Sequence, residues 1–186
     1  MVPVTSLWLP ILLSAVLVFV VSSVIHMLTP WHKGDIRGVK GEEDAMAALR
    51  RLDIPPGDYV MPYAGSMQAM KDPAYVARLE AGPAVFMTVW KGSTSMTGSL
   101  VGWFLYSVVV SIFAGYLAGA AVPAGASYLE VFRFAGTTAF AAYALALPQH
   151  SIWWKRNWGA TTRSMIDGLL YACLTAGAFG WLWPVS

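Results

Sequence analysis

The sequence has few charged residues and a single cysteine. Charged side chains make up 12% of its 186 residues, about half of the roughly 25% usual in a soluble domain. Because Cys173 is the only cysteine, an internal disulfide is excluded, and no Cys/His spacing of a structural zinc site is present. The net charge of +2 gives no reason to expect binding to nucleic acid.

The common catalytic motifs are also missing. The chain contains no His-Glu-x-x-His, no phosphate-binding glycine loop, no Gly-x-Ser-x-Gly and no dinucleotide-binding fingerprint. A catalytic domain of the soluble type is therefore not expected, and we predict a protein that is not an enzyme. These missing motifs indicate no cofactor, and its identity, if there is one, is left open.

Hydrophobic residues, by contrast, make up 57% of the chain, and the charges are segregated. Residues 30–97 contain eight basic and eight acidic residues, which leaves six charges for the rest of the sequence. Each long apolar stretch has about the 20 residues that cross a hydrocarbon core. We therefore predict an all-α membrane protein with four transmembrane helices and a small α+β cytoplasmic insert between helices 1 and 2. The predicted helices are 7–29, 98–122, 131–152 and 164–184, and the insert is 30–97.

The first span is expected to remain in the mature protein. No Lys or Arg precedes Leu7, the apolar run is longer than that of a signal peptide, and no small-x-small cleavage site follows Met27. It is therefore interpreted as a membrane helix.

The basic residues predict the orientation in a bacterial inner membrane. The 153–163 connection contains Lys155, Arg156 and Arg163 without an acidic residue, whereas the 123–127 turn has no charge. Because positively charged loops stay in the cytoplasm, we expect 30–97 and 153–163 inside and both termini outside. Seven of the nine tryptophans fall at predicted span ends, as in an aromatic belt.

The insert contains signals for short elements. Three acidic residues at 42–44 and two basic residues at 50–51 suit the two ends of a helix. Asp72, Pro73 and Gly82 mark the N-cap, first turn and end of a second helix over 73–81. Residues 58–62 and 84–90 are β-rich and predicted to pair. A segment this small buries little core, so we expect it to rest on the membrane or on a partner.

Two spans carry small residues at every fourth position, the spacing that lets membrane helices approach closely. We expect the two striped helices to pack closely against each other or against a partner's helices, although Gly and Ala are also common in membrane helices generally. Pro148 predicts a kink near the inner end of the third span. The packing residues are Ser107, Ser111, Gly115 and Gly119 in the second span, and Gly168, Ala172, Ala176 and Gly180 in the fourth.

Three ionisable residues are predicted near the inner ends of their spans, namely His26, His150 and Asp167. Ionisable groups at membrane depth are costly and often functional. Two histidines on different helices can bind a haem or pigment, or form a metal or proton site together with Asp167. The simpler alternative is that water satisfies the histidines at the interface and that Arg163 pairs with Asp167 at i+4.

One more ion pair is expected on the outer side. Arg133 lies in the third span near its outer end, and Glu130 lies one turn earlier. This i,i+3 spacing allows the two side chains to pair at the interface.

Several runs of this sequence resemble a family of small multi-span bacterial membrane proteins. They are Trp8 to Phe19, Ser22 to Met27, Trp31-His-Lys, Ile54-Pro-Pro-Gly-Asp-Tyr and Phe132-Arg-Phe-Ala-Gly-Thr-Thr-Ala-Phe. The resemblance covers most of the chain and implies no reaction. By analogy, the chain is also similar in kind to accessory subunits of energy-converting membrane complexes, such as a photosynthetic core.

The leading hypothesis is a non-catalytic accessory subunit that contacts the lipid bilayer and other membrane-protein subunits or itself. One alternative is a small oligomeric transporter or channel, which the scarcity of polar residues along the spans disfavours. The other is a haem-, pigment- or metal-binding protein that uses His26 and His150.

Overall fold

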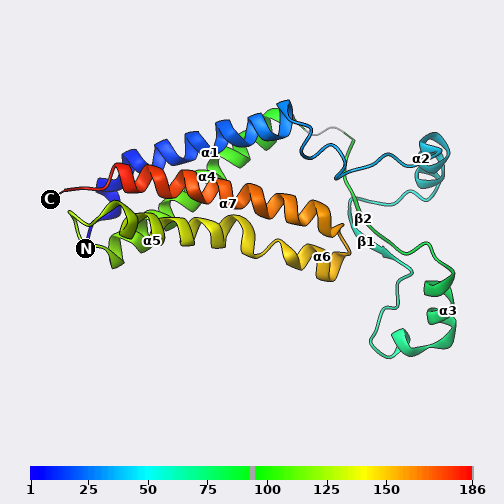
Figure 1. Ribbon diagram of the computed structural model, residues 1–186. Helices are drawn as coiled ribbons and strands as arrows, with labels where there is room; N and C mark the ends of the chain where they lie inside the picture. Colours follow the sequence, from blue (N-terminus) through cyan, green and yellow to red (C-terminus); the bar gives the residue numbers. More distant parts are fainter. Residues whose placement is uncertain (93–94, 186) are drawn as a thin grey trace. The chain divides into compact units, whose positions relative to one another are not determined.

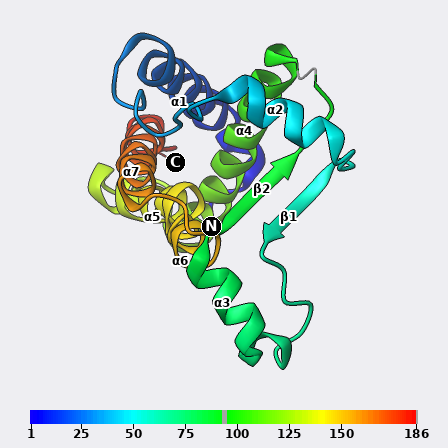
Figure 2. The same cartoon turned by 90° about the vertical axis from the view of Figure 1, so that its right-hand side faces the viewer.

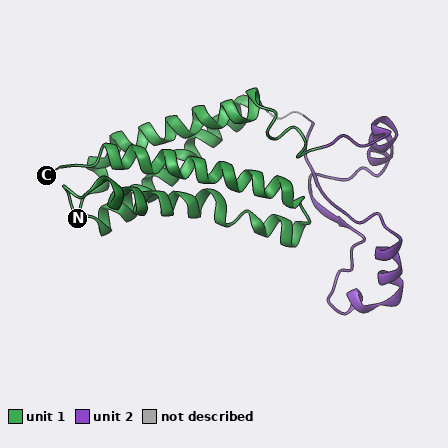
Figure 3. Cartoon of the chain, in the orientation of Figure 1, with its two compact units in different colours: residues 1–36, 95–186 green, residues 37–94 purple. Residues whose placement is uncertain are grey.

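The computed structural model describes residues 1–92 and 95–185, and the chain divides into two compact units (Figure 3). The helical bundle comprises residues 1–36 and 95–186, and the insert comprises residues 37–94. Figure 1 shows the elements in chain order. The fold is mostly helical with one small sheet, as the composition predicts.

Among the described residues, three stretches of the bundle are long and apolar enough to cross a membrane. The first joins the 3-10 turn η1 (Val4–Leu7) to helix α1 (Trp8–Leu28). The second is helix α4 (Met96–Ala121), whose N-cap Ser95 accepts a hydrogen bond from the amide of Gly98. The third extends over Tyr128–Trp154. These three agree with the first three predicted spans to within a few residues.

The third span is not a continuous α-helix. Helix α5 (Tyr128–Phe140) starts with a capping box between Ser127 and Glu130 and is followed by a π-helical segment, η3 (Ala141–Leu145), and the short helix α6 (Pro148–Trp154). Pro148 has no N–H, and its ring would collide with the carbonyl four residues earlier. The Ala144 carbonyl instead accepts the Leu147 amide at 3.1 Å. Near Pro148, where a kink is predicted, the regular α-helix is interrupted by the π-helical segment and then by this i→i−3 turn.

The last helix, α7 (Trp158–Trp181), begins six residues earlier than the predicted span. Asn157 caps it by accepting hydrogen bonds from the amides of Gly159 and Ala160. The prediction treated Arg163 as part of a polar connection, but the cap places it in the second turn of the helix. With Arg163 and Asp167 inside it, α7 is not among the helices apolar enough to be identified as a span.

The four long helical stretches form a ring in which α1 contacts α4 and α7, and α5 also contacts α4 and α7 (Figure 2). The small-residue stripes lie at these contacts. A Cβ on Gly115 would lie 3.0 Å from the Phe179 ring, and one on Gly119 would collide with the Val2 carbonyl. The α4 stripe therefore packs on the N-terminal segment, on the Phe179 ring of the last helix and on α1, where Ser14 donates to Ser111 at 2.9 Å.

The α7 stripe faces the third span. A Cβ on Gly168 would meet Ala144, and one on Gly180 would meet the ring of Tyr128. Ala172 and Ala176 are buried between these two glycines. The expectation that the two striped helices pack closely on each other is therefore wrong for most of their length. The stripes pack on other neighbours within the chain, and α4 meets α7 mainly where the Phe179 ring reaches Gly115.

The insert contains helix α2 (Glu42–Arg51), helix α3 (Pro73–Ala81) and the antiparallel strands β1 (Gly57–Met61) and β2 (Val85–Val89), with the short 3-10 turn η2 (Ala69–Lys71). Both predicted helices and the predicted strand pairing are confirmed. No described side chain of this unit is buried. The insert therefore has secondary structure without a hydrophobic core.

Candidate functional site

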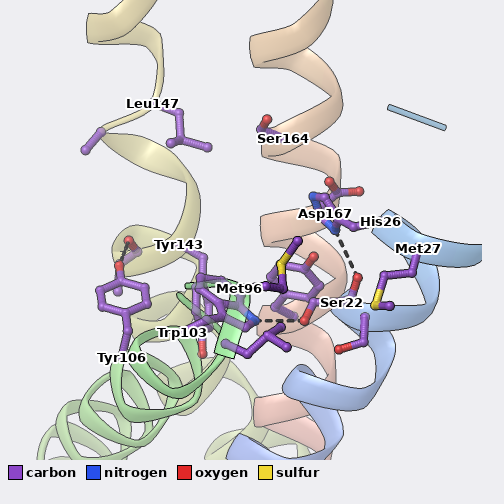
Figure 4. A pocket seen from close by; sticks show the side chains of 15 residues that line it. Ser22, His26, Met27, Met96, Trp103, Tyr106, Tyr143, Leu147, Ser164 and Asp167 are labelled. Carbon is purple, nitrogen blue, oxygen red and sulfur yellow. Dashed lines mark hydrogen bonds between the residues drawn. The ribbon is translucent and has the colours of Figure 1, made fainter. Parts of the chain in front are cut away.

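The bundle contains a cavity of about 640 Å³ at the end away from the two chain termini (Figure 4). Its walls come from the last turns of α1, the first turns of α4, the π-helical segment η3 and the first half of α7. Most of the lining is apolar, and serine, histidine and aspartate side chains lie at one side. Such a lining is typical of sites for small organic molecules.

Aromatic rings form one wall of the cavity. The Trp103 ring lies within 6.0 Å, centroid to centroid, of the rings of Tyr106, Tyr143 and Tyr171. Trp103 is held in place because its indole N–H donates to the Ser22 hydroxyl at 2.8 Å, which also joins α4 to α1. These contacts give the cavity a fixed aromatic surface.

The tyrosine hydroxyls in this wall differ in their partners. The Tyr106 hydroxyl donates to the Ala142 carbonyl at 2.9 Å. The Tyr171 hydroxyl is buried and has no hydrogen-bond partner among the described residues, and the Tyr143 hydroxyl lies near Ser107 without forming a hydrogen bond. An unsatisfied buried hydroxyl costs about 1–3 kcal/mol. Tyr143 and Tyr171 line the cavity, so their buried hydroxyls are unused hydrogen-bonding groups next to an apolar surface.

A group of side chains that we call the polar cluster lies at the polar side of the cavity. Two members, His26 and Asp167, line the cavity itself. The others come from the segment that follows α1 and from the second turn of α7. The polar cluster consists of His26, Trp31, His32, Asp35, Arg163 and Asp167.

His32 connects two carboxylates. Its Nδ1 lies 2.7 Å from Asp35 and its Nε2 lies 2.6 Å from Asp167. Asp35 also accepts hydrogen bonds from the Nε of Arg163, at 2.8 Å, and from its Nη2. Both ring nitrogens of His32 face carboxylate oxygens, so the ring donates to both carboxylates when it carries two ring protons and to one of them in a neutral tautomer.

The pKa of Asp35 reflects this arrangement. Burial alone would raise the pKa, since only 10% of the Asp35 side chain is exposed. Hydrogen bonds from His32 and Arg163, together with their positive charges, outweigh burial and lower the pKa below its usual value. Asp35 is therefore a stable carboxylate that fixes the orientation of the His32 ring.

Asp167 is the most buried charged group of the polar cluster. Its side chain is 6% exposed, and its second oxygen accepts the indole N–H of Trp31 at 3.0 Å. Buried carboxylates require such partners. The 30–36 segment is thereby attached to α7 through Asp167, as it is through Asp35 and Arg163.

His26 stacks on His32, with ring centroids 4.4 Å apart and planes within 9° of parallel. Its Nδ1 lies 2.9 Å from the Ser22 carbonyl oxygen. Because a carbonyl can only accept, Nδ1 donates this hydrogen bond, and Nε2 is the ring nitrogen that the Ser22 contact leaves free. The His26 ring lies beside His32 and Asp167.

The structure brings together two of the three ionisable residues singled out from the sequence. His26 and Asp167 lie in the polar cluster, whereas His150 is an exposed residue on α6 and does not belong to it. The position expected for His150 is taken by His32, which the sequence analysis did not treat as a site residue. Asp35 three residues after His32 was the available signal, since a His-x-x-Asp spacing allows a carboxylate to orient the ring.

The two expected ion pairs also differ from their predicted partners. Arg163 binds Asp35 rather than Asp167, because the 30–36 segment folds back onto α7. Glu130 accepts hydrogen bonds from the amide and hydroxyl of Ser127 as part of the capping box, and Arg133 is exposed. Capping therefore takes up the carboxylate that was expected to hold Arg133.

Comparison with protein-family models, with curated proteins and with solved structures finds no match to this chain.

Proposed function

We propose that the protein is an integral membrane protein that binds a lipophilic molecule in the cavity beside the polar cluster. The ligand would carry oxygens that accept hydrogen bonds, as a quinone does. The observation that carries this proposal is the buried, unpartnered hydroxyl of Tyr171 in a largely apolar cavity of about 640 Å³. Once a shift of the Tyr171 ring uncovers this hydroxyl, a carbonyl oxygen of the ligand would accept from it, and the apolar part of the ligand would lie against Trp103.

The proposal includes a fourth membrane crossing by α7. Its Asp167 is buried and partnered inside the bundle, while Ile166, Leu169 and Leu170 are exposed on the outer side. This division between a polar interior and an apolar exterior suits a helix whose outer face meets lipid.

We place the cavity end of the bundle at the cytoplasmic side of a bacterial inner membrane, with both termini outside. Lys33, Lys155 and Arg156 support this orientation, because basic residues are retained on the cytoplasmic side. The same orientation would put the insert in the cytoplasm.

The ligand proposal can be tested with decylubiquinone and the protein purified in mild detergent. Binding is measured by equilibrium dialysis against protein-free micelles of the same detergent, with decylbenzene as the analogue that lacks oxygens. We expect saturable binding of decylubiquinone at one molecule per chain and weaker binding of decylbenzene. Tyr171→Phe is expected to weaken decylubiquinone binding about two- to tenfold, the equivalent of one hydrogen bond.

A matched pair of variants separates the cavity from the lipid-facing surface. Ala142 and the neighbouring Ala141 are both exposed, but only Ala142 lines the cavity. Ala142→Trp is expected to abolish decylubiquinone binding and Ala141→Trp to leave it unchanged. Equal binding by both variants, or uptake no greater than in empty micelles, would show that the cavity is not the site.

A second function, as an accessory subunit of a larger membrane complex, is supported by the insert. Residues 37–94 have no buried side chain among those described, yet Met46 and Leu49 expose apolar surface on one face of α2. A segment without a core gains stability by docking. Purification from native membranes is expected to recover a stoichiometric partner with the wild-type chain. The partner should be absent from preparations of the double variant Met46→Glu, Leu49→Glu and present in those of Glu42→Gln. Recovery of the wild-type chain alone would contradict this role.

A further inference from the structure

Three metal-ligating side chains from separate parts of the bundle meet in the polar cluster. His26 comes from the last turns of α1, His32 from the segment after it, and Asp167 from the middle of α7. One ligand atom of each lies within 4.8 Å of the others. The geometry points to a divalent transition-metal site formed by His26, His32 and Asp167, which is separate from the proposed ligand function and does not depend on it.

The contacts behind these side chains are those that metal ligands usually have. Metal-bound histidines typically donate their second ring N–H to a backbone carbonyl or a carboxylate. His26 makes this contact to the Ser22 carbonyl and His32 makes it to Asp35. In both rings the contact uses Nδ1 and leaves Nε2 as the ligand atom.

The carboxylate of Asp167 is supported in the same way. One oxygen accepts the Trp31 indole N–H, and the other faces His32. Ligating carboxylates are commonly held by such hydrogen bonds. All three candidate ligands are therefore oriented by groups that would not bind the ion themselves.

The donor set selects the type of ion. Two imidazole nitrogens and one carboxylate oxygen suit Zn²⁺, Co²⁺ or Cu²⁺ better than Ca²⁺ or Mg²⁺, which prefer oxygen ligands. Three protein ligands leave a further coordination position open, as in catalytic rather than structural zinc sites. Because His26 and Asp167 also line the cavity, that position is accessible to a small molecule within it.

Binding requires a local rearrangement. The ion replaces the hydrogen between His32 and Asp167, and the stacked imidazole rings turn toward a common point. The His26 side chain is on the exposed side of α1, so its ring has room to turn. The anchors at Ser22, Asp35 and Trp31 are kept through this movement.

The experiment uses the full chain purified in mild detergent, treated with EDTA and titrated with Co²⁺. We expect one ion per chain, a visible Co²⁺ absorption spectrum, and its loss when Zn²⁺ displaces the ion. His26→Ala, His32→Ala and Asp167→Asn are each expected to weaken Co²⁺ binding more than about 100-fold, and Trp31→Phe about 10-fold by loss of its supporting hydrogen bond.

His150→Ala is the matched control, since it removes an exposed histidine outside the polar cluster. It is expected to bind Co²⁺ as the wild type does. Electron paramagnetic resonance of the Cu²⁺-loaded wild type gives a test that needs no variant, and we expect hyperfine coupling to two nitrogens. No stoichiometric binding, equal binding by all variants, or coupling to fewer than two nitrogens would overturn the proposal.

Discussion

Gly168 of α7 packs directly on Ala144 of the π-helical segment. A Cβ at Gly168 would lie 2.9 Å from the Ala144 Cβ and 3.2 Å from the Tyr143 carbonyl oxygen. Gly168→Ala is therefore expected to lower the free energy of unfolding by about 1–3 kcal/mol, the usual cost of overpacking. Equilibrium unfolding of the purified protein in mixed micelles measures this change in the free energy of unfolding.

Gly177 provides the control on the same helix. A Cβ there would meet only the Tyr128 hydroxyl, at 3.6 Å, which is an ordinary contact. Gly177→Ala is expected to be neutral or stabilising, by up to about 1 kcal/mol, since Ala favours the helix. Equal destabilisation by both variants would argue against the close contact at Gly168.

The hydrogen bond from Ser14 to Ser111 joins α1 to α4 in the buried interior. A double-mutant cycle with Ser14→Ala and Ser111→Ala is expected to give a coupling energy of about 0.6 kcal/mol, typical of hydrogen bonds between membrane helices. The same unfolding assay reports it. A coupling energy of zero would mean that the two hydroxyls do not interact.

The pairing of Arg163 with Asp35 predicts a clear charge effect. Arg163→Met leaves the Asp35 carboxylate buried without its guanidinium partner and is expected to destabilise the bundle by about 1.5–3 kcal/mol. Adding Asp35→Asn removes that charge, so the double variant should recover part of the loss. Arg156→Met, at an exposed position, should change stability by less than about 0.5 kcal/mol.

The lack of a core in the insert predicts how its amides exchange with solvent. In hydrogen exchange measured by mass spectrometry, backbone amides of residues 37–94 should exchange much faster than those of α4 or α7, since local opening exposes no buried apolar surface. Protection of α2 or α3 as strong as that of the bundle would contradict this. A slowing of exchange in native membranes would identify the faces that dock.

The proposed fourth crossing predicts the sides of the membrane on which the two ends of the chain lie. Reporter fusions after residue 60 and at the C-terminus should report opposite sides, with residue 60 in the cytoplasm. Fusions on the same side would mean that α7 does not cross. The stability predictions for the bundle do not depend on that result.

Much of the architecture could be predicted because it depends on local signals. The apolar runs marked α1, α4 and the Tyr128–Trp154 stretch, and Asp72 with Pro73 marked α3. The start of α7 was missed because a charged residue, Arg163, was taken as the end of a span. Its charge is tolerated there because Asp35 neutralises it, and that contact joins residues 128 positions apart.

Only part of the candidate site could be predicted, because only some of its residues have a local signal in the sequence. His26 and Asp167 stood out because ionisable groups are rare in apolar helices. His32 lies in a polar segment where a histidine is unremarkable, so only the folding of 30–36 onto α7 gives it a role. The unpartnered hydroxyl of Tyr171 also depends on the packing of four helical stretches and has no local signature.

The two ends of the bundle are fastened by different kinds of bond. Near the termini, two backbone hydrogen bonds join Val2 to Gly119 and Gly125 to Pro184, and the Trp183 indole donates to the Pro123 carbonyl. Only a substitution to proline would remove either backbone donor. At the cavity end the hydrogen bonds between the 30–36 segment and α7 all use side chains, those of Trp31, His32 and Arg163 among them. Thermal fluctuations should therefore separate the helices at the cavity end first. A ligand can then enter there while the helices near the termini stay packed.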